Sequence, residues 1–296
     1  MSTQAVHDRD GWIWMNGEFV PWRDAKVHVL THGLHYASSV FEGERAYDGV
    51  VFEGHRHSER LHRSAKMLGF EIPFSADELD SAKLQTMSKM GLENCYVRPV
   101  AWRGSEMMGV SAQQNKINVA IACWEWPGYY ADKMKGIKLT LSPWRRPAPD
   151  TIPCMAKAAG LYMICTLSKH WAEQEGYGDA LMLDYRGYVA EATSANVFFV
   201  RDGAIHTPTP DCFLNGLTRQ TVIRLAKARG LEVIERHIMP TELPTFSECF
   251  LTGTAAELTP VASILEHKYK PAAITEQLID DYTNATKPGK NRGKNA

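Results

Sequence analysis

One lysine and one glutamate are the first candidates for chemistry, because each lies among small residues. Lys157 lies in Met155-Ala156-Lys157-Ala158-Ala159-Gly160, and Glu191 lies in Val189-Ala190-Glu191-Ala192. Small neighbours just ahead of an expected helix leave room beside the amine for the bulk of a cofactor. Taken singly, a surface lysine on an Ala-rich turn and a carboxylate at a strand end remain the more ordinary explanations.

Several common catalytic motifs are absent from the sequence. It contains no Gly-x-Gly-x-x-Gly, no Walker loop, no His-Glu-x-x-His and no Gly-x-Ser-x-Gly. His55, His57 and His62 lie close together, but a helix would place His55 and His57 on different faces, so we expect no metal site. The cysteines are scattered without a Cys-x-x-Cys pair, which argues against a zinc site or a disulfide scaffold. They are Cys95, Cys123, Cys154, Cys165, Cys212 and Cys249.

Composition narrows the class of protein further. The 296 residues include 33 basic and 34 acidic side chains, a formal net charge of −1, with 44% hydrophobic and 23% charged residues. These values are typical of globular proteins, and the absence of a basic surplus argues against a nucleic-acid partner. No apolar run approaches the ~18 residues that span a bilayer, and the polar N-terminus lacks the apolar core of a signal peptide. We therefore expect a cytoplasmic protein without a membrane partner.

Turn and capping signals predict the order of the elements. Asn16-Gly17 predicts a hairpin between residues 13–15 and 18–20, and Asp48-Gly49 predicts a second between 41–47 and 50–52. Ser75 with Glu78 predicts a capping box for a helix that ends before Gly91. Further helices are expected over 56–68, 159–174, 218–229 and 271–282. Further strands are expected over 95–103, 117–126, 137–142, 231–236 and 248–252, with strand pairs over 180–191 and 196–207.

Both halves of the chain mix hairpins with helices and lack the alternation typical of a parallel sheet. We therefore predict two α+β domains, a smaller one over 1–126 and a larger one over 137–296 that carries Lys157. Residues 127–136, which begin Pro127-Gly128, are expected to link the domains. The polar residues 287–296 are expected to form a flexible tail.

Longer motifs extend the pattern over about residues 11 to 265. They include Ser39-Val40-Phe41-Glu42-Gly43, Glu59-Arg60-Leu61-His62, Tyr96-Val97-Arg98-Pro99, Ala156-Lys157-Ala158, Gly216-Leu217-Thr218-Arg219 and Gly253-Thr254-Ala255-Ala256. In this order they resemble the branched-chain amino acid aminotransferases, which are fold-type-IV pyridoxal-phosphate enzymes. The resemblance implies a two-domain, D-amino acid aminotransferase-like architecture and a homodimer or higher homo-oligomer. It also implies transamination between leucine, isoleucine or valine and 2-oxoglutarate, giving branched-chain 2-oxo acids and L-glutamate.

The resemblance also implies roles for three residues around the pyridine ring of pyridoxal 5′-phosphate. Lys157 corresponds to the Schiff-base lysine, which binds the cofactor and moves the proton between substrate Cα and cofactor C4′. Glu191 corresponds to the partner of the pyridine nitrogen, which it keeps protonated so that the ring accepts electrons. Tyr162 corresponds to the tyrosine near the phenolic oxygen.

Four residues match positions that bind the cofactor phosphate. Arg60 offers a bidentate charged contact. Leu217 and Thr218 open an expected helix, so their backbone N–H groups and the helix dipole favour an anion. Thr254 adds a hydroxyl and an N–H group. We therefore expect the phosphate to be bound by Arg60, Leu217, Thr218 and Thr254.

The substrate residues implied by the resemblance lie mostly in the first half. Tyr96 and Arg98 are two apart on a strand, so both project from one face. Arg98 would meet the side-chain carboxylate of glutamate, while Tyr96 with the Thr254-Ala255 backbone would bind the α-carboxylate. The apolar walls of the same pocket match Tyr36, Phe41, Val110 and Tyr129.

Alternatives remain open on substrate range. Ala195, in the segment that follows Glu191, replaces a glutamate found in many family members and makes this segment more like that of D-amino acid aminotransferases. Trp102 and Arg103 are bulkier and more charged than a purely aliphatic site requires. A D-amino acid aminotransferase and an aminodeoxychorismate lyase are thus alternatives within the fold. A non-catalytic binding protein is the alternative from another class, although Lys157, Glu191 and Arg60 argue against it.

Overall fold

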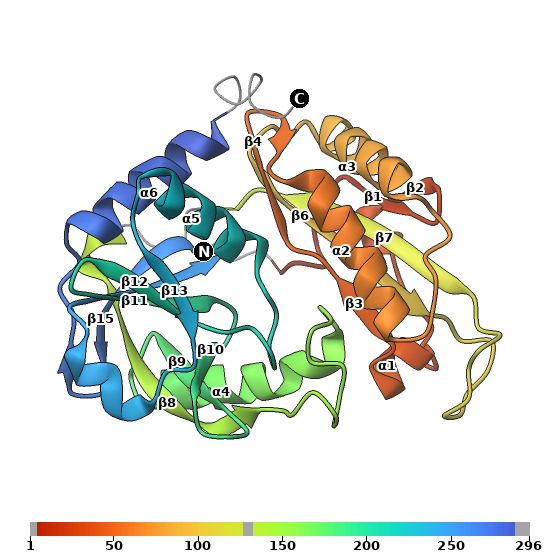
Figure 1. Ribbon diagram of the computed structural model, residues 1–296. Helices are drawn as coiled ribbons and strands as arrows, with labels where there is room; N and C mark the ends of the chain where they lie inside the picture. The colour runs from red at the N-terminus through yellow and green to blue at the C-terminus, as the bar shows by residue number, and fades with distance from the viewer. Residues whose placement is uncertain (1–4, 127–132, 288–296) are drawn as a thin grey trace. The chain divides into compact units, whose positions relative to one another are not determined.

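The computed structural model describes residues 5–126 and 133–287 (Figure 1). The chain forms two compact units, Met1–Gly128 with Ala156–Gly160, and Tyr129–Met155 with Leu161–Ala296. Most of the expected linker, residues 127–132, and nearly all of the expected tail, 288–296, lie outside the described residues. The sequence places Lys157 in the second domain, whereas the segment that carries it clusters with the first unit. The reason is a backbone pairing, because Val40 forms a β-bridge with Ala158.

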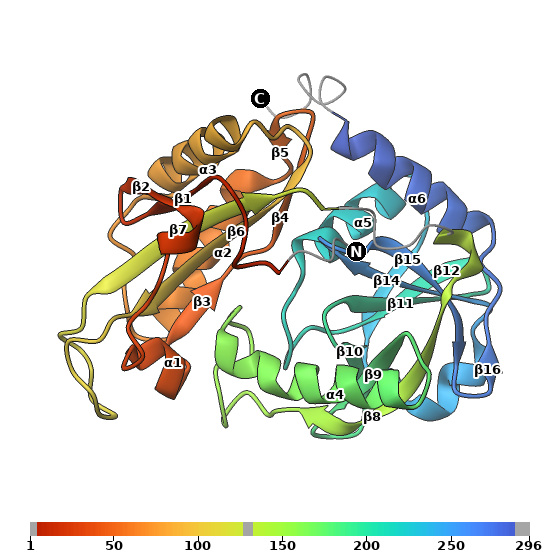
Figure 2. The same ribbon diagram turned by 180° about the vertical axis from the view of Figure 1, so that it is seen from behind.

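The first unit is built on a seven-stranded antiparallel sheet. The strands lie in the order β2-β1-β7-β6-β4-β5, with β3 also paired to β6. They span Trp12–Met15 (β1), Glu18–Pro21 (β2), Ser39–Phe41 (β3), Glu44–Tyr47 (β4), Val50–Val51 (β5), Cys95–Arg103 (β6) and Ile117–Trp124 (β7). Helices α2 (Gly54–Met67) and α3 (Ala76–Met90) cover one face of this sheet, as both views show (Figures 1 and 2). A short helix α1 (His32–Tyr36) precedes β3.

Local signals explain the elements of the first unit. The hairpin at Asn16-Gly17 is confirmed, with both turn residues at positive φ as this two-residue turn requires. The capping box of Ser75 and Glu78 is formed, and Gly91 ends α3 in the left-handed conformation. The turn at Asp48-Gly49 is also formed, but the strand expected over 41–47 is interrupted between β3 and β4.

The second unit is built on a nine-stranded sheet that partly closes on itself. The strands lie in the order β10-β9-β8-β15-β14-β11-β12-β13, and β16 pairs with β15. Because β10 also pairs with β11, the six strands from β10 to β11 in this order form a closed ring. The strands span Ile137–Arg146 (β8), Asp179–Asp184 (β9), Val189–Ala192 (β10), Asn196–Arg201 (β11), Ala204–Pro208 (β12), Val233–Arg236 (β13), Glu248–Gly253 (β14), Glu257–Ile264 (β15) and His267–Lys268 (β16).

Three helices accompany this sheet. Helix α4 (Met163–Gln174) packs along β8 and β9, and α5 (Leu217–Ala228) lies beside α6 (Ala273–Thr286) (Figure 2). Short 3-10 helices span Trp22–Asp24, Lys133–Lys135, Ala159–Tyr162 and Pro240–Thr245. The helix expected over 159–174 therefore begins as a 3-10 turn. No helix among the described residues is long and apolar enough to cross a membrane.

Strand β15 was not expected from the sequence. It contains Pro260 and is buried over most of its length instead of alternating between buried and exposed residues. A proline-free run is a usual signal of a strand, and Pro260 removes that signal from β15. Its residues Val261 and Ile264 instead belong to the core of the second unit, with Leu139, Phe199 and Leu251.

Candidate active site

Lys157 is fixed through its main chain, while its side chain is half-buried. Its N–H donates to Oγ of Ser64, in α2, at 3.0 Å, and its carbonyl accepts the N–H of Phe41 at 3.1 Å. The amine lies 4.9 Å from the centre of the Phe41 ring. The backbone is therefore held at this residue, which suits a lysine that binds a cofactor and transfers a proton at a fixed position.

Arg60 is held by a carboxylate to which the sequence assigned no role. Glu42 is fully buried, and its two oxygens accept hydrogen bonds from Nε and Nη2 of Arg60, each at 2.7 Å. Nδ1 of His57 donates to the same carboxylate at 2.7 Å. Burial alone would raise the pKa of Glu42, but Arg60 and His57 together, through their charge and hydrogen bonds, hold that pKa well below its ordinary value. Burial lowers the pKa of His57, so its ring is a neutral donor here.

Tyr96 and Arg98 share one face of β6, as their spacing predicts. Nη2 of Arg98 donates to the hydroxyl of Tyr96 at 3.0 Å, and the guanidinium carbon lies 4.9 Å from the centre of the Phe41 ring. The Tyr96 ring also packs against Trp124 and Trp126, with ring centres 5.1 and 4.9 Å away. The pair thus presents a cation and a hydroxyl side by side, an arrangement that suits a carboxylate.

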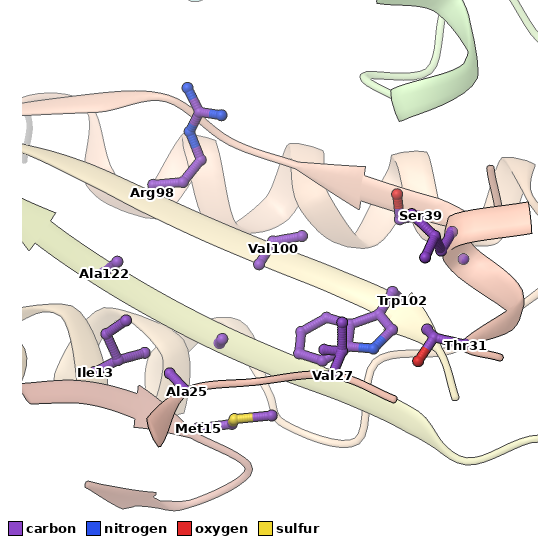
Figure 3. A pocket seen from close by; sticks show the side chains of 13 residues that line it. Ile13, Met15, Ala25, Val27, Thr31, Ser39, Arg98, Val100, Trp102 and Ala122 are labelled. Atoms are coloured by element: carbon purple, nitrogen blue, oxygen red, sulfur yellow. The ribbon is translucent and has the colours of Figure 1, made fainter. Parts of the chain in front are cut away.

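This face of the sheet is hollowed into a pocket of about 370 Å³ (Figure 3). Its lining is apolar except at a few positions, and Figure 3 shows the guanidinium of Arg98 pointing away from Ile13 and Met15. Of the described residues assigned to the substrate, Arg98 lines this pocket. The bulky Trp102, which has no assigned role, lines it as well. The remaining lining residues are Ala25, Val27, Thr31, Gly33, Leu34, Ser39, Val100, Ala120 and Ala122.

Two of the residues expected to wall the substrate pocket are exposed in the structure, and a third is not described. Tyr36 is 44% exposed and Val110 is 88% exposed, and neither lines the pocket described above. His32 connects their two segments, because its ring stacks on Tyr36 and its Nε2 bonds the carbonyl of Gly109 at 2.9 Å. Tyr129 lies outside the described residues.

Glu191 lies on β10 in the second unit and is 9% exposed. Its Oε1 is 3.3 Å from Nε of Arg146, and its Oε2 accepts a hydrogen bond from Nδ2 of Asn196 at 3.2 Å. Burial lowers the pKa of Arg146, but Glu191 and further acidic neighbours such as Cys165 together raise it above its ordinary value. A charged guanidinium therefore stands beside the carboxylate and favours its ionised form, which a partner of a protonated pyridine nitrogen requires.

The residues expected to bind phosphate in the second unit lie at two chain turns. Helix α5 begins at Leu217 after Gly216, and no side chain caps it. Leu217 and Thr218 are buried, so the first turn of α5 offers backbone N–H groups and a dipole to an anion. Thr254 follows β14 in the turn that leads to β15, and it is half-buried together with Ala255.

Tyr162 is half-buried at the start of α4, in the second unit. Sequence reasoning missed three residues that support the predicted ones, namely Glu42, Arg146 and Asn196. Their roles depend on partners far along the chain, even where the residue itself stands within a motif. Only a buried charged or amide group inside an otherwise apolar segment signals such a partner in the sequence.

Comparison with known proteins identifies the family of this chain. A family profile described as "Amino-transferase class IV" matches residues 39–264. The chain belongs to the class IV aminotransferases. The predicted α+β, fold-type-IV architecture is thereby confirmed.

This class IV aminotransferase is similar to branched-chain amino acid aminotransferases of several organisms. It is 44% identical over 252 residues to a "Probable branched-chain-amino-acid aminotransferase" of Rickettsia felis, covering 85% of this chain and 86% of that protein. The solved branched-chain amino acid aminotransferase of Escherichia coli superposes with a TM-score of 0.91 at 39% identity, covering 93% of this chain and 94% of that one. The solved enzyme of Thermobaculum terrenum, described as in its PLP-form, superposes with a TM-score of 0.86 at 31% identity, covering 94% of each chain.

Proposed function

We propose that this enzyme is a branched-chain amino acid aminotransferase that uses pyridoxal 5′-phosphate. It transfers the amino group between L-leucine, L-isoleucine or L-valine and 2-oxoglutarate, giving branched-chain 2-oxo acids and L-glutamate. One geometric observation supports this substrate pair in particular. Arg98 bonds the Tyr96 hydroxyl at the edge of an apolar pocket, so a single site offers both apolar walls and a cation.

The described residues fit the cofactor. A half-buried lysine has its backbone fixed, a buried carboxylate stands beside a charged arginine, and a buried helix start lacks a side-chain cap. These are the groups that an aldehyde, a pyridinium and a phosphate require. When bound, pyridoxal 5′-phosphate withdraws electrons from the substrate and so eases removal of the Cα proton.

Lys157, Glu191 and Tyr162 act at different atoms of the cofactor. The amine of Lys157 holds the cofactor and then takes and returns the proton at the substrate Cα. Glu191 keeps a proton on the pyridine nitrogen, with Arg146 and Asn196 fixing its two oxygens. The hydroxyl of Tyr162 binds at the phenolic oxygen.

We assign the remaining cofactor residues to the phosphate. Arg60, oriented by Glu42, supplies a fixed positive charge. The N–H groups of Leu217 and Thr218 and the hydroxyl of Thr254 complete the anion site. On the substrate side, we assign Arg98 to the second carboxylate of glutamate, and Tyr96, Thr254 and Ala255 to the α-carboxylate. The resemblance assigns the aliphatic chain to Tyr36, Phe41, Val110 and Tyr129, of which the three described residues lie outside the lining of the pocket beside Arg98.

A homodimer or higher homo-oligomer is part of this proposal. The hydrogen bond between His32 and Gly109 joins two chain segments that both expose large apolar side chains. These side chains are Leu30, Leu34 and Tyr36 in the first segment and Met108 and Val110 in the second. An exposed apolar cluster of this kind is typical of an interface, and we take its occupant to be a second copy of the chain. Sedimentation of the purified protein tests this directly. A monomer at micromolar concentration would contradict it.

We also infer that the enzyme acts in the cytoplasm. All six cysteines are buried and free, which supports a reducing compartment, where thiols are kept reduced.

The function is tested by assaying the purified protein with pyridoxal 5′-phosphate, 2-oxoglutarate and each amino acid. We expect L-glutamate to form with L-leucine, L-isoleucine and L-valine, and not with Lys157→Ala. D-alanine and D-glutamate are included because the segment around Ala195 favours D-amino acid aminotransferases. Turnover with D-amino acids alone would replace the proposed function with that alternative.

A further inference from the structure

Asn196 makes three hydrogen bonds at the centre of the second unit's site residues. The residue is 4% exposed. Its Nδ2 donates to Oε2 of Glu191 at 3.2 Å and to the carbonyl of Leu214 at 3.0 Å. Its Oδ1 accepts the backbone N–H of Gly216 at 3.1 Å. One side-chain amide therefore joins the Glu191 carboxylate to the residues that lead into α5.

The sheet places Asn196 where this connection is possible. It opens β11, and its backbone pairs with Glu191 in β10 on one side and with Thr252 in β14 on the other. Thr252 lies two residues before Thr254. Three chain segments that carry proposed cofactor residues thus meet around one position.

Gly216 shows how tightly this amide is packed. Its backbone, at φ −60° and ψ 141°, is a conformation that any residue adopts, so conformational freedom does not explain the glycine. Space does, because a Cβ at this position would overlap Oδ1 of Asn196. The start of α5 is therefore pressed against the Asn196 amide.

We propose that Asn196 is a positioning residue that couples the two ends of the cofactor site. Its N–H₂ group orients the Glu191 carboxylate toward the pyridine nitrogen, and its oxygen fixes Gly216 so that the α5 N-terminus faces the phosphate. This inference rests on the proposed function, in which Glu191 and the start of α5 bind opposite ends of pyridoxal 5′-phosphate. Loss of the amide then weakens binding at both ends, although Asn196 itself need not touch the cofactor.

The binding of three ligands to the apo-protein distinguishes the pyridine end of the site from the phosphate end. Pyridoxal lacks the phosphate and reports the pyridine end, inorganic phosphate reports the α5 end, and pyridoxal 5′-phosphate reports both. Half-saturation is measured by absorbance for the two aldehydes and by thermal protection for phosphate. For Asn196→Ala we expect weaker binding of all three, with pyridoxal 5′-phosphate weakened roughly 10- to 100-fold, the range for a hydrogen bond to a charged group.

Two further variants make the test selective. Asn196→Asp keeps an oxygen for the Gly216 N–H but turns a second oxygen toward Glu191, so we expect weaker pyridoxal binding and nearly unchanged phosphate protection. Gly216→Ala displaces the amide oxygen, and we expect it to weaken phosphate protection. A merely structural role would weaken the binding of both pyridoxal and phosphate in Asn196→Asp. Both variants also carry the test if Asn196→Ala fails to fold.

Asn115 provides a matched control in the first unit. It is 5% exposed, donates to the carbonyls of Gly104 and Met107, and accepts the N–H of Met107. Like Asn196 it donates two hydrogen bonds and accepts one, but these three partners include no charged group. Asn115→Ala is expected to lower the melting temperature without changing any of the three half-saturation values. Equal losses in Asn115→Ala and Asn196→Ala, or wild-type ligand binding in Asn196→Ala, would overturn the inference. If the wild-type apo-protein does not bind pyridoxal 5′-phosphate, the proposed function itself has failed.

Discussion

The hydroxyl of Tyr96 occupies the space in which a side chain of Gly43 would stand. A Cβ on Gly43 would overlap this oxygen and come within 3.0 Å of the ring carbon that bears it. The φ angle of Gly43 is not positive, so an alanine meets no backbone strain there. The absence of a side chain at Gly43 therefore decides where the Tyr96 hydroxyl lies, and with it the hydrogen bond from Arg98.

Replacing Gly43 by alanine tests this relationship. The added methyl group must displace the Tyr96 hydroxyl and break its bond to Arg98, at a cost of roughly 1–3 kcal/mol, typical of an overpacked site. We expect weaker binding of L-glutamate and 2-oxoglutarate in single-turnover measurements, by about tenfold or more.

The double variant Gly43→Ala/Tyr96→Phe distinguishes this collision from general damage. Removing the hydroxyl removes the atom that the methyl group meets, so the double variant is expected to be no worse than Tyr96→Phe alone. Additive losses from the two substitutions would show that they act independently.

Local signals in the sequence predicted those parts of the fold that depend on neighbouring residues. The turn at Asn16-Gly17 and the capping box of Ser75 and Glu78 each require only a few adjacent residues, and both are present. Strand β15 depends instead on its partners β14 and β8, which supply its hydrogen bonds despite Pro260. Pro260 interrupts the run by which a strand is otherwise found in a sequence.

The residues that hold the site residues in place were harder to predict from the sequence than the site residues themselves. Glu42 stands in a motif that pointed to the family, but its bond to Arg60 joins residues 18 positions apart in different elements. Asn196 likewise reaches Gly216 across 20 positions. No periodicity or spacing rule encodes such tertiary pairs, so a buried polar residue predicts that a partner exists without identifying it.

Glu191→Gln tests the carboxylate at the pyridine nitrogen. A neutral amide cannot hold the proton on that nitrogen, so the cofactor withdraws electrons less effectively. We expect turnover with L-leucine to fall by orders of magnitude while the variant still binds pyridoxal 5′-phosphate through Lys157, and absorbance measurements check this binding. Wild-type turnover would mean that Glu191 is only structural.

Glu42→Gln tests the buried pair with Arg60 through its dependence on pH. The pKa of Glu42 is held below its ordinary value, so the ionised form contributes stability above that value and loses it as the pH falls. Unfolding of the wild type should therefore become easier from about pH 5 downward, and this part of the slope should disappear in the variant. At neutral pH, removal of one member of a buried ion pair is expected to cost roughly 3–5 kcal/mol.

Glu59 offers a control for this pH series. It lies on the same helix as Arg60, but its side chain is 49% exposed and forms surface pairs, 3.7 Å from Arg63 and 3.9 Å from His55. Glu59→Gln is expected to leave both the slope and the neutral-pH stability within about 0.5 kcal/mol of the wild type. A wild-type slope in Glu42→Gln would assign the acid sensitivity to other carboxylates.

Arg98→Met separates the two half-reactions of the proposed transamination. The aliphatic chain of leucine needs only apolar walls, whereas glutamate brings a second carboxylate that is costly to bury without a cation. Arg98 already bonds the Tyr96 hydroxyl and lies against the Phe41 ring, so the guanidinium is held in place before a substrate arrives. Methionine keeps the apolar stem and removes the charge. We expect single-turnover rates and affinities for L-glutamate and 2-oxoglutarate to fall by the equivalent of roughly 2–5 kcal/mol, with much smaller losses for L-leucine and its 2-oxo acid. Equal losses for leucine and glutamate would instead place Arg98 at the α-carboxylate that both substrates share.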